Sequence, residues 1–258
     1  MLNLIDTHAH LTYSGLLESL DDVLARSTAA GVTKWLAVGT DAEHNEKVAI
    51  LAQKYENIYA ILGIHPHHAS EYQPQDLQRL IELIGSGKVA ALGETGLDFH
   101  YNFSKQDAQR DLFKRFLEIA SLTRLPVVIH SRNAFEETMQ IIDNFADRKT
   151  KIVFHCWGGT VEQTREVIKR DFYVSFTGIV TFKNAQDIRE AAKTVPLERM
   201  MIETDCPFMS PEPMRKQKIN EPALLIYTAQ KIAELKGVDL ETLAEQLAAN
   251  TKDFFNLG

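Results

Sequence analysis

Residues 4–10 read Leu-Ile-Asp-Thr-His-Ala-His, an apolar start that ends in two histidines. Side chains alternate between the faces of a β-strand, so His8 and His10 point the same way, as two ligands of one metal ion must. A lone His-x-His is weak evidence, because two histidines also meet by chance or hydrogen-bond to each other. The positions of the other histidines and carboxylates must therefore decide whether the motif binds metal.

Short apolar runs alternate with longer amphipathic segments along the whole chain. The runs predicted to be strands are 2–6, 34–38, 58–64, 89–93, 127–130, 152–155, 172–176 and 200–203. Helical patterns cover 20–30, 42–55, 77–84, 106–123, 135–145, 161–170, 185–194 and 222–236. Such alternation implies a parallel sheet with right-handed crossovers, and eight units are what a closed (β/α)8 barrel needs.

The predicted fold class is α/β, a single (β/α)8 TIM-type barrel over residues 1–258 with an extra C-terminal helical segment at 239–255. A length of 258 residues is common for such barrels. No internal repeat, low-complexity tract or linker indicates a second domain. An open doubly wound sheet is the alternative, but no Gly-x-Gly-x-x-Gly follows the first predicted strand.

The composition is that of a globular protein, with 45% hydrophobic and 24% charged residues. No apolar run approaches the roughly 18 residues that cross a bilayer, and no signal-peptide pattern is present, so we expect a cytoplasmic protein. No feature of the sequence indicates an obligate protein partner. Cys156 and Cys206 are too few for a disulfide framework and are predicted to be small buried thiols. The net charge of −7 argues against an extended basic surface for duplex nucleic acid.

Metal-competent side chains fall at the carboxyl ends of the predicted strands, where barrel active sites are built. They are His8, His10, Glu94, His130, His155 and Asp205. Taken singly, each is as compatible with a hydrogen bond, a helix cap or a braced turn, but their shared placement favours a site. Four imidazoles and two carboxylates are more than one tetrahedral zinc needs, so we expect two divalent ions.

The ligands can be divided between these two ions. We assign His8, His10 and Asp205 to one ion, His130 and His155 to the other, and Glu94 as the bridge. Mixed nitrogen and oxygen ligands suit Zn²⁺ or Mn²⁺, whereas Mg²⁺ normally takes fewer imidazoles, and the sequence leaves the choice open. Two divalent ions leave the centre positive, so an acidic protein can still attract an anionic substrate.

Several motifs, in order along almost the whole chain, resemble the TatD family of metal-dependent hydrolases in the amidohydrolase superfamily. They are Asp6-Thr7-His8-Ala9-His10, Gly63-Ile64-His65-Pro66, Gly93-Glu94-Thr95-Gly96-Leu97-Asp98, His130-Ser131-Arg132, His155-Cys156, Gly178-Ile179-Val180-Thr181-Phe182-Lys183-Asn184, Glu203-Thr204-Asp205 and Asn220-Glu221-Pro222. The resemblance implies a TIM-type barrel, a divalent-metal centre on the same ligands, and hydrolysis usually described as deoxyribonuclease. Cys206 stands where the family often has Ser or Ala, a departure from which we expect little change. Met214 stands where many members have His, and the loss of that polar contact puts substrate preference in doubt.

The expected chemistry is attack by a metal-bridging hydroxide, with Asp205 and Glu94 as catalytic carboxylates and Asp205 as the proton acceptor. Predicted substrate contacts are His65, Arg132, Lys183 and Glu203. Four further ring-bearing residues either stack on nucleobases or pack within loops, namely Phe99, His100, Tyr101 and Trp157.

We therefore expect a deoxyribonuclease acting on DNA ends or single strands. The alternative is an amide or ester hydrolase, such as a D-aminoacyl-tRNA deacylase, because the same activated water attacks carbon or phosphorus. The partner is accordingly DNA or another small phosphodiester or acyl substrate. A third possibility, a binding scaffold with structural metal, fits poorly because structural zinc sites are closed four-ligand cages, often rich in cysteine.

Overall fold

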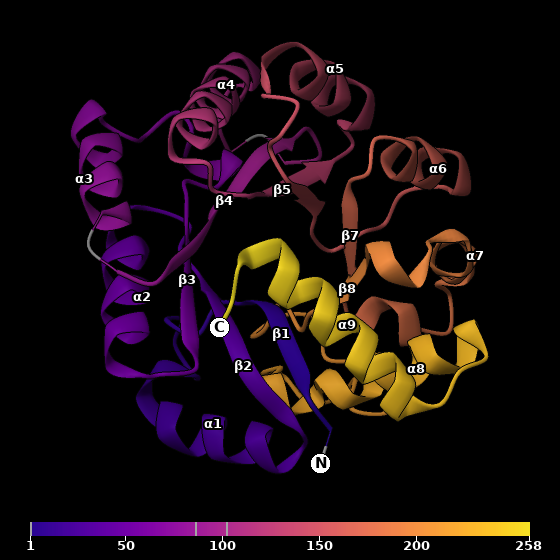
Figure 1. The fold of residues 1–258 in the computed structure, drawn as a ribbon. Coiled ribbons are helices and arrows are strands. Elements are labelled where there is room, and N and C mark those ends of the chain that lie inside the picture. The colour runs from indigo at the N-terminus through magenta and orange to yellow at the C-terminus, as the bar shows by residue number, and fades with distance from the viewer. Residues whose placement is uncertain (1, 86, 102) are drawn as a thin grey trace. The chain divides into compact units, whose positions relative to one another are not determined.

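The computed structural model describes residues 2–85, 87–101 and 103–258, and in these residues eight strands alternate with helices (Figure 1). They form one sheet in the order β1 to β8, and the pairs β1–β2, β3–β4, β4–β5, β5–β6 and β7–β8 are parallel. The strands are β1 (Leu4–Ala9), β2 (Val32–Val38), β3 (Ile58–Leu62), β4 (Val89–Asp98), β5 (Val127–Arg132), β6 (Ile152–Phe154), β7 (Tyr173–Phe176) and β8 (Met200–Ile202). This order confirms the predicted (β/α)8 TIM-type fold.

The helices follow the predicted segments closely. They are α1 (Leu20–Ala29), α2 (Ala42–Lys54), α3 (Pro74–Ile84), α4 (Gln106–Thr123), α5 (Phe135–Phe145), α6 (Val161–Lys169), α7 (Gln186–Thr194), α8 (Leu225–Lys236) and α9 (Leu240–Phe255). Helix α3 begins earlier than predicted because Pro74 opens it and Gln73 forms a capping box with Asp76. The C-terminal segment predicted as one or two helices is the single helix α9.

Strand β4 is the largest departure from the predicted boundaries, because it extends to Asp98 rather than ending at residue 93. The glycines that looked like a strand end are places where neighbouring strands approach closely. A Cβ at Gly93 would lie 2.7 Å from the carbonyl oxygen of Val128 in β5, and one at Gly96 would lie 2.1 Å from the carbonyl oxygen of His130. Glu94 therefore lies within a strand instead of after it, as does His8 in β1.

The chain divides into two compact units. The first unit comprises Met1–Ala37 and His155–Gly258, and the second comprises Val38–Phe154. Each unit has a buried apolar core, with Phe176 and Phe254 in the first and Phe113 and Phe116 in the second. A single domain over residues 1–258 stays a prediction.

In the first unit, helix α9 packs at the beginning of β8. The side chain of Asn250 donates hydrogen bonds to the backbone oxygens of Leu197 (2.6 Å) and Met200 (2.9 Å), which precede and start that strand. Phe254 and Phe255 at the end of α9 are buried. The extra helix thus covers the amino end of β8 and leaves the loop after its carboxyl end to carry functional side chains.

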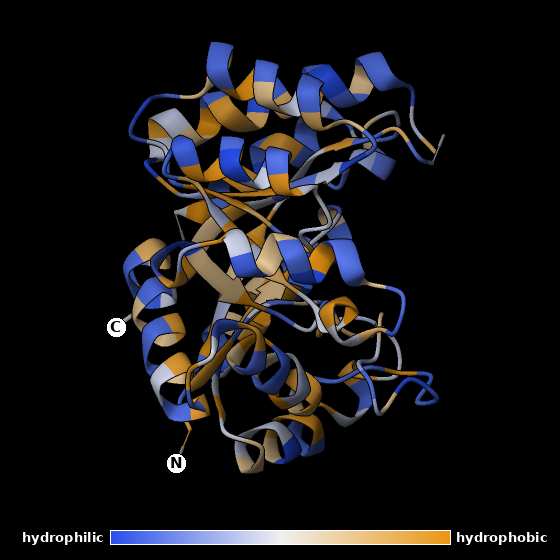
Figure 2. Cartoon of the chain, turned by 90° about the vertical axis from the view of Figure 1, so that its right-hand side faces the viewer, coloured by the Kyte–Doolittle hydropathy of each residue, from blue (hydrophilic) through white to orange (hydrophobic). Residues whose placement is uncertain are grey.

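The helices carry both hydrophilic and hydrophobic residues along their length, as expected for helices that pack one face on a sheet (Figure 2). Within the residues that the structure describes, no helix is both long enough and apolar enough to cross a membrane.

Candidate metal centre

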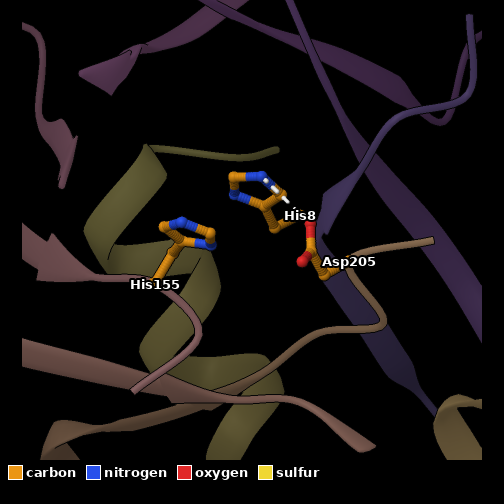
Figure 3. Close-up of side chains that lie close together, drawn as sticks. All are labelled: His8, His155 and Asp205. Atoms are coloured by element: carbon orange, nitrogen blue, oxygen red, sulfur yellow. Dashed lines mark ion pairs between the residues drawn. The ribbon is translucent and has the colours of Figure 1, made fainter. Parts of the chain in front are cut away.

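In the first unit, two imidazoles and a carboxylate converge at strand ends (Figure 3). His8 lies in β1, His155 follows Phe154 in the chain, and Asp205 follows β8. Each residue offers one ligand atom, and these atoms lie within 4.8 Å of one another. The rings of His8 and His155 stack with centroids 4.1 Å apart, and Nε2 of His8 is 3.7 Å from Oδ1 of Asp205. We call these three buried residues the first cluster.

His10 adjoins the first cluster through Asp205. Its Nε2 lies 3.1 Å from Oδ1 of Asp205, whose backbone N–H donates to the carbonyl of His8. Burial alone would raise the pKa of the Asp205 carboxyl, but the hydrogen bond from His10 and the nearby imidazoles of His8 and His155 hold it below its ordinary value. Asp205 is therefore an ionised carboxylate in a buried setting, which suits a cation ligand.

Glu203 supports His155 from behind. Its Oε1 accepts the backbone N–H of Cys156 (2.6 Å) and lies 3.3 Å from Nδ1 of His155. A carboxylate that accepts the N–H of one ring nitrogen fixes the tautomer and leaves the other nitrogen with a lone pair for a metal ion. This is the usual arrangement of a metal-binding histidine. Glu203 is 1% exposed, so the structure gives it this contact, and its predicted part in substrate binding stays a prediction.

Asp6 braces the loop that carries Asp205. Its buried carboxylate accepts hydrogen bonds from the backbone N–H (2.9 Å) and the hydroxyl (2.5 Å) of Thr204, and from the backbone N–H of His8 (3.3 Å). Burial raises the pKa of Asp6 to about 7, although these hydrogen bonds lower it. The sequence analysis gave Asp6 no role, yet it ties both His8 and the residue before Asp205 to one group.

In the second unit, His65, Glu94 and His130 form a second cluster. His65 follows β3, while Glu94 and His130 lie within β4 and β5. Oε1 of Glu94 is 2.7 Å from Nδ1 of His130 and 3.3 Å from Nε2 of His65. One ligand atom from each residue lies within 4.8 Å of the others, so this set also has the geometry to hold a cation.

Asp98 anchors the second cluster, and the sequence analysis missed this role. Its Oδ2 lies 2.9 Å from Nε2 of His67 and 3.1 Å from Nε2 of His130, while Oδ1 accepts the backbone N–H groups of His100 and Tyr101. Burial would raise the pKa of Asp98, but the hydrogen bonds from His130, His67 and Tyr101 hold it well below its ordinary value. Side chains alternate between the faces of a strand, so a predicted strand that continued past Gly93 would place Asp98 on the same face as Glu94.

His130 and His65 differ in what they offer a cation. A neutral imidazole has only one N–H, and His130 has a carboxylate oxygen near each of its two ring nitrogens. When His130 is neutral, one of its nitrogens therefore turns a lone pair toward one of these oxygens. A bound cation or a second proton would satisfy that contact. His65 is neutral at neutral pH because burial lowers its pKa to about 4, and its Nδ1 accepts the backbone N–H of His67. Its proton is thus on Nε2, which donates to Glu94.

The structure groups His155 with His8 and Asp205, whereas the sequence prediction assigned His155 and His130 to one ion. Which ligand binds which ion stays a prediction. The donor sets themselves fit a divalent cation, because each is a mixture of imidazole nitrogen and carboxylate oxygen without thiolate, buried in the first cluster and partly buried in the second.

Two predicted substrate residues are exposed. Arg132 ends β5, and its guanidinium lies 4.7 Å from the centroid of the Tyr101 ring. Lys183 is exposed in the loop before α7, and its backbone carbonyl accepts a hydrogen bond from Arg189. Their binding of substrate stays a prediction, as does that of His65.

The two cysteines and Trp157 lie in different environments. Cys206 is buried, as predicted, and burial raises its pKa well above the ordinary value. The prediction of a fully buried thiol is wrong for Cys156, which is partly exposed because it lies in a loop with φ +45° rather than on a strand. Trp157 is buried and donates its indole N–H to the hydroxyl of Thr164 on α6, so its ring is held against that helix.

Fold and donor sets together define a metal-dependent hydrolase built on a TIM-type barrel. The family model described as "TatD related DNase" matches residues 5–256. An uncharacterized metal-dependent hydrolase, YabD of Bacillus subtilis, is 38% identical over 98% of this chain and 99% of its own length. A protein of Shigella flexneri named 3'-5' ssDNA/RNA exonuclease TatD is 34% identical over 98% of this chain and 99% of its own length. The crystal structure of a TatD homologue from Escherichia coli K12 aligns with a TM-score of 0.93 and 28% identity. The alignment covers 99% of this chain and 98% of the homologue. The chain belongs to the TatD family.

Proposed function

We propose that this protein is a nuclease that hydrolyses phosphodiester bonds at the ends of single-stranded DNA. The observation that carries the proposal is the pair of clusters of imidazoles and carboxylates at strand ends, the first buried and the second with a buried carboxylate between two partly buried imidazoles. The family description and the exonuclease names of relatives such as the Shigella flexneri protein support DNA as the substrate. The formal charge of −7 favours a terminus or a single strand over a long duplex footprint.

We propose two divalent ions, with Zn²⁺, Mn²⁺ and Mg²⁺ as candidates. Their ligands would be the residues that the sequence predicts, namely His8, His10, Glu94, His130, His155 and Asp205. When bound, such ions lower the pKa of water and stabilise the negative charge that develops on the phosphoryl oxygens.

The protein groups then have separate tasks. Asp205 is ionised and follows a short strand, so its carboxylate can accept the proton of the attacking water. Glu203 orients His155, and Asp98 orients His130. Exposed Arg132 and Lys183 supply positive charge for the phosphates of the strand.

The test compares substrates and metals in one series. The protein is stripped of metal, reconstituted separately with Mg²⁺, Mn²⁺ and Zn²⁺, and assayed on single-stranded DNA labelled at either end, duplex DNA, D-aminoacyl-tRNA and simple amides. We expect mononucleotide release from single strands, and the label position gives the polarity. Hydrolysis of the carbonyl substrates alone would overturn the proposal in favour of a deacylase or amidase.

A further inference from the structure

Two exposed aromatic rings stack on each other next to the second cluster. Phe103 is 66% exposed and Tyr101 39% exposed, and their ring centroids are 5.3 Å apart with planes inclined by 21°. Single exposed apolar side chains are common on protein surfaces and need no explanation. A stacked pair whose outer ring is mostly in water is a different feature, because it presents a flat π surface that a planar ligand can extend.

The pair is fixed in place by two groups next to the second cluster, His67 and Asp98. The edge of the His67 ring meets both Tyr101, at a centroid distance of 5.5 Å, and Phe103, at 4.9 Å. His67 in turn contacts Oδ2 of Asp98, and Oδ1 of Asp98 accepts the backbone N–H of Tyr101. The buried carboxylate of Asp98 therefore holds Tyr101 and His67 and also contacts His130, so the two aromatic rings keep a defined position relative to a candidate metal ligand.

A cation completes the arrangement. The exposed guanidinium of Arg132 lies 4.7 Å from the centroid of the Tyr101 ring. An aromatic surface beside an arginine matches a nucleotide of a single strand, in which an unpaired base stacks and the adjoining phosphate takes the positive charge. A strand paired in a duplex cannot offer a base face in this way.

We propose that Tyr101 and Phe103 form a stacking site for one unpaired nucleobase of the substrate, with Arg132 contacting a phosphate of the same strand. This proposal rests on the proposed nuclease function and specifies its substrate as a strand whose end carries an unpaired base. Stacking is tolerant of base identity because every base has a π face, so the site selects for single-strandedness rather than for sequence.

The experiment is a cycle of two substrates and two proteins. One oligonucleotide is normal and the other carries an abasic site at each of the positions near the hydrolysed end. For the metal-loaded wild-type protein, we expect KM to be roughly ten-fold higher for the abasic strand. In Phe103→Leu, which keeps an apolar side chain but removes the ring, this ratio should fall to about one. A ratio unchanged from the wild type would overturn the proposal.

A matched control is available within the same unit. Phe145 on α5 is also exposed, at 44%, and lies 5.4 Å from the ammonium of Lys114, so it is an aromatic ring near a cation far along the chain from the stacked pair. Phe145→Leu should keep the wild-type KM ratio. If it lowers the ratio as Phe103→Leu does, the effect is not specific and the stacking site is wrong.

A binding readout separates this inference from the proposed function. A single strand carrying 2-aminopurine near each end loses fluorescence when that base stacks on an aromatic ring, whether or not hydrolysis follows. We expect quenching by the wild-type protein and its loss in Phe103→Leu. Hydrolysis without quenching would overturn the stacking site alone, whereas quenching without hydrolysis under any metal would overturn the nuclease and keep the site.

Discussion

The two clusters use similar residues but hold them differently. In the first cluster, the carboxylate belongs to Asp205, a residue after β8 with φ +52° that faces three imidazoles. In the second, Glu94 lies inside β4, and its neighbour Asp98, which ends that strand, places a second carboxylate near the ring of His130. A carboxylate within a strand is held by the sheet, whereas one at a turn can approach a reacting water. We infer that the second cluster mainly positions its ligands and that the first supplies the reactive carboxylate.

The largest effect is expected from Asp205→Asn, which keeps the size of the side chain and one oxygen but removes the proton acceptor. General base catalysis is typically worth about 10²- to 10⁴-fold, so kcat on single-stranded DNA should fall by that range while much of the bound metal is retained. Steady-state kinetics with metal analysis measures both. The control is Asp187→Asn, an exposed carboxylate in the first turn of α7. Unchanged turnover in Asp205→Asn would assign the proton to another group.

The next largest effect is expected from Asp98→Asn. The amide has one acceptor oxygen, whereas Asp98 now serves two imidazoles and two backbone N–H groups, so one side of this network loses its acceptor. Loss of a carboxylate behind a metal-binding histidine typically costs roughly 10- to 100-fold in metal affinity or activity. Metal titration followed by activity gives the apparent Kd. Wild-type affinity would mean that Asp98 does not position His130.

A smaller effect is expected from Glu203→Gln in the first cluster. The amide oxygen can still accept from the backbone N–H of Cys156 and from Nδ1 of His155, so the ring orientation survives. The charge is lost, together with the Oε2 acceptor of the Thr7 hydroxyl (3.5 Å). We expect kcat to fall roughly three- to ten-fold, at the weak end of such substitutions. Metal titration followed by activity, measured on Glu203→Gln and Asp98→Asn side by side, decides which substitution costs more. A larger loss in Glu203→Gln would reverse our ranking of the two supporting carboxylates.

The repeating parts of the fold could be predicted from the sequence because local pattern determines them. Helices α4 and α5 have the predicted boundaries, since their apolar periodicity and their ends are local signals. Strand β4 could not be bounded in this way. Its glycines interrupt the β pattern, and the reason for them, the close approach of the backbone of β5, lies far along the sequence.

The candidate site divides in the same manner. Residues with metal-binding chemistry at strand ends, such as His8 and Asp205, are visible in the sequence because barrels place their sites there. The roles of supporting groups such as Asp98 and Asp6 were not predicted, because no sequence pattern distinguishes an aspartate that accepts several hydrogen bonds from any other aspartate. Only folding brings Asp6 to Thr204, almost two hundred positions along the chain.

The smallest effect expected concerns stability, and it isolates Asp98 from metal chemistry. The native pKa of Asp98 is held below the ordinary value of 3.8, so in the unfolded chain this carboxyl binds a proton at a higher pH than in the native protein. The stabilisation due to the ionised group is therefore complete well above pH 3.8 and declines as the pH falls through that value. Urea unfolding of metal-free wild type and Asp98→Asn, at about pH 6 and about pH 4, should show a stability difference that is larger at the higher pH. An equal difference at both values would mean that the imidazoles of His130 and His67 do not stabilise the ionised form, and the second cluster would then lose its claim to be the more firmly anchored of the two.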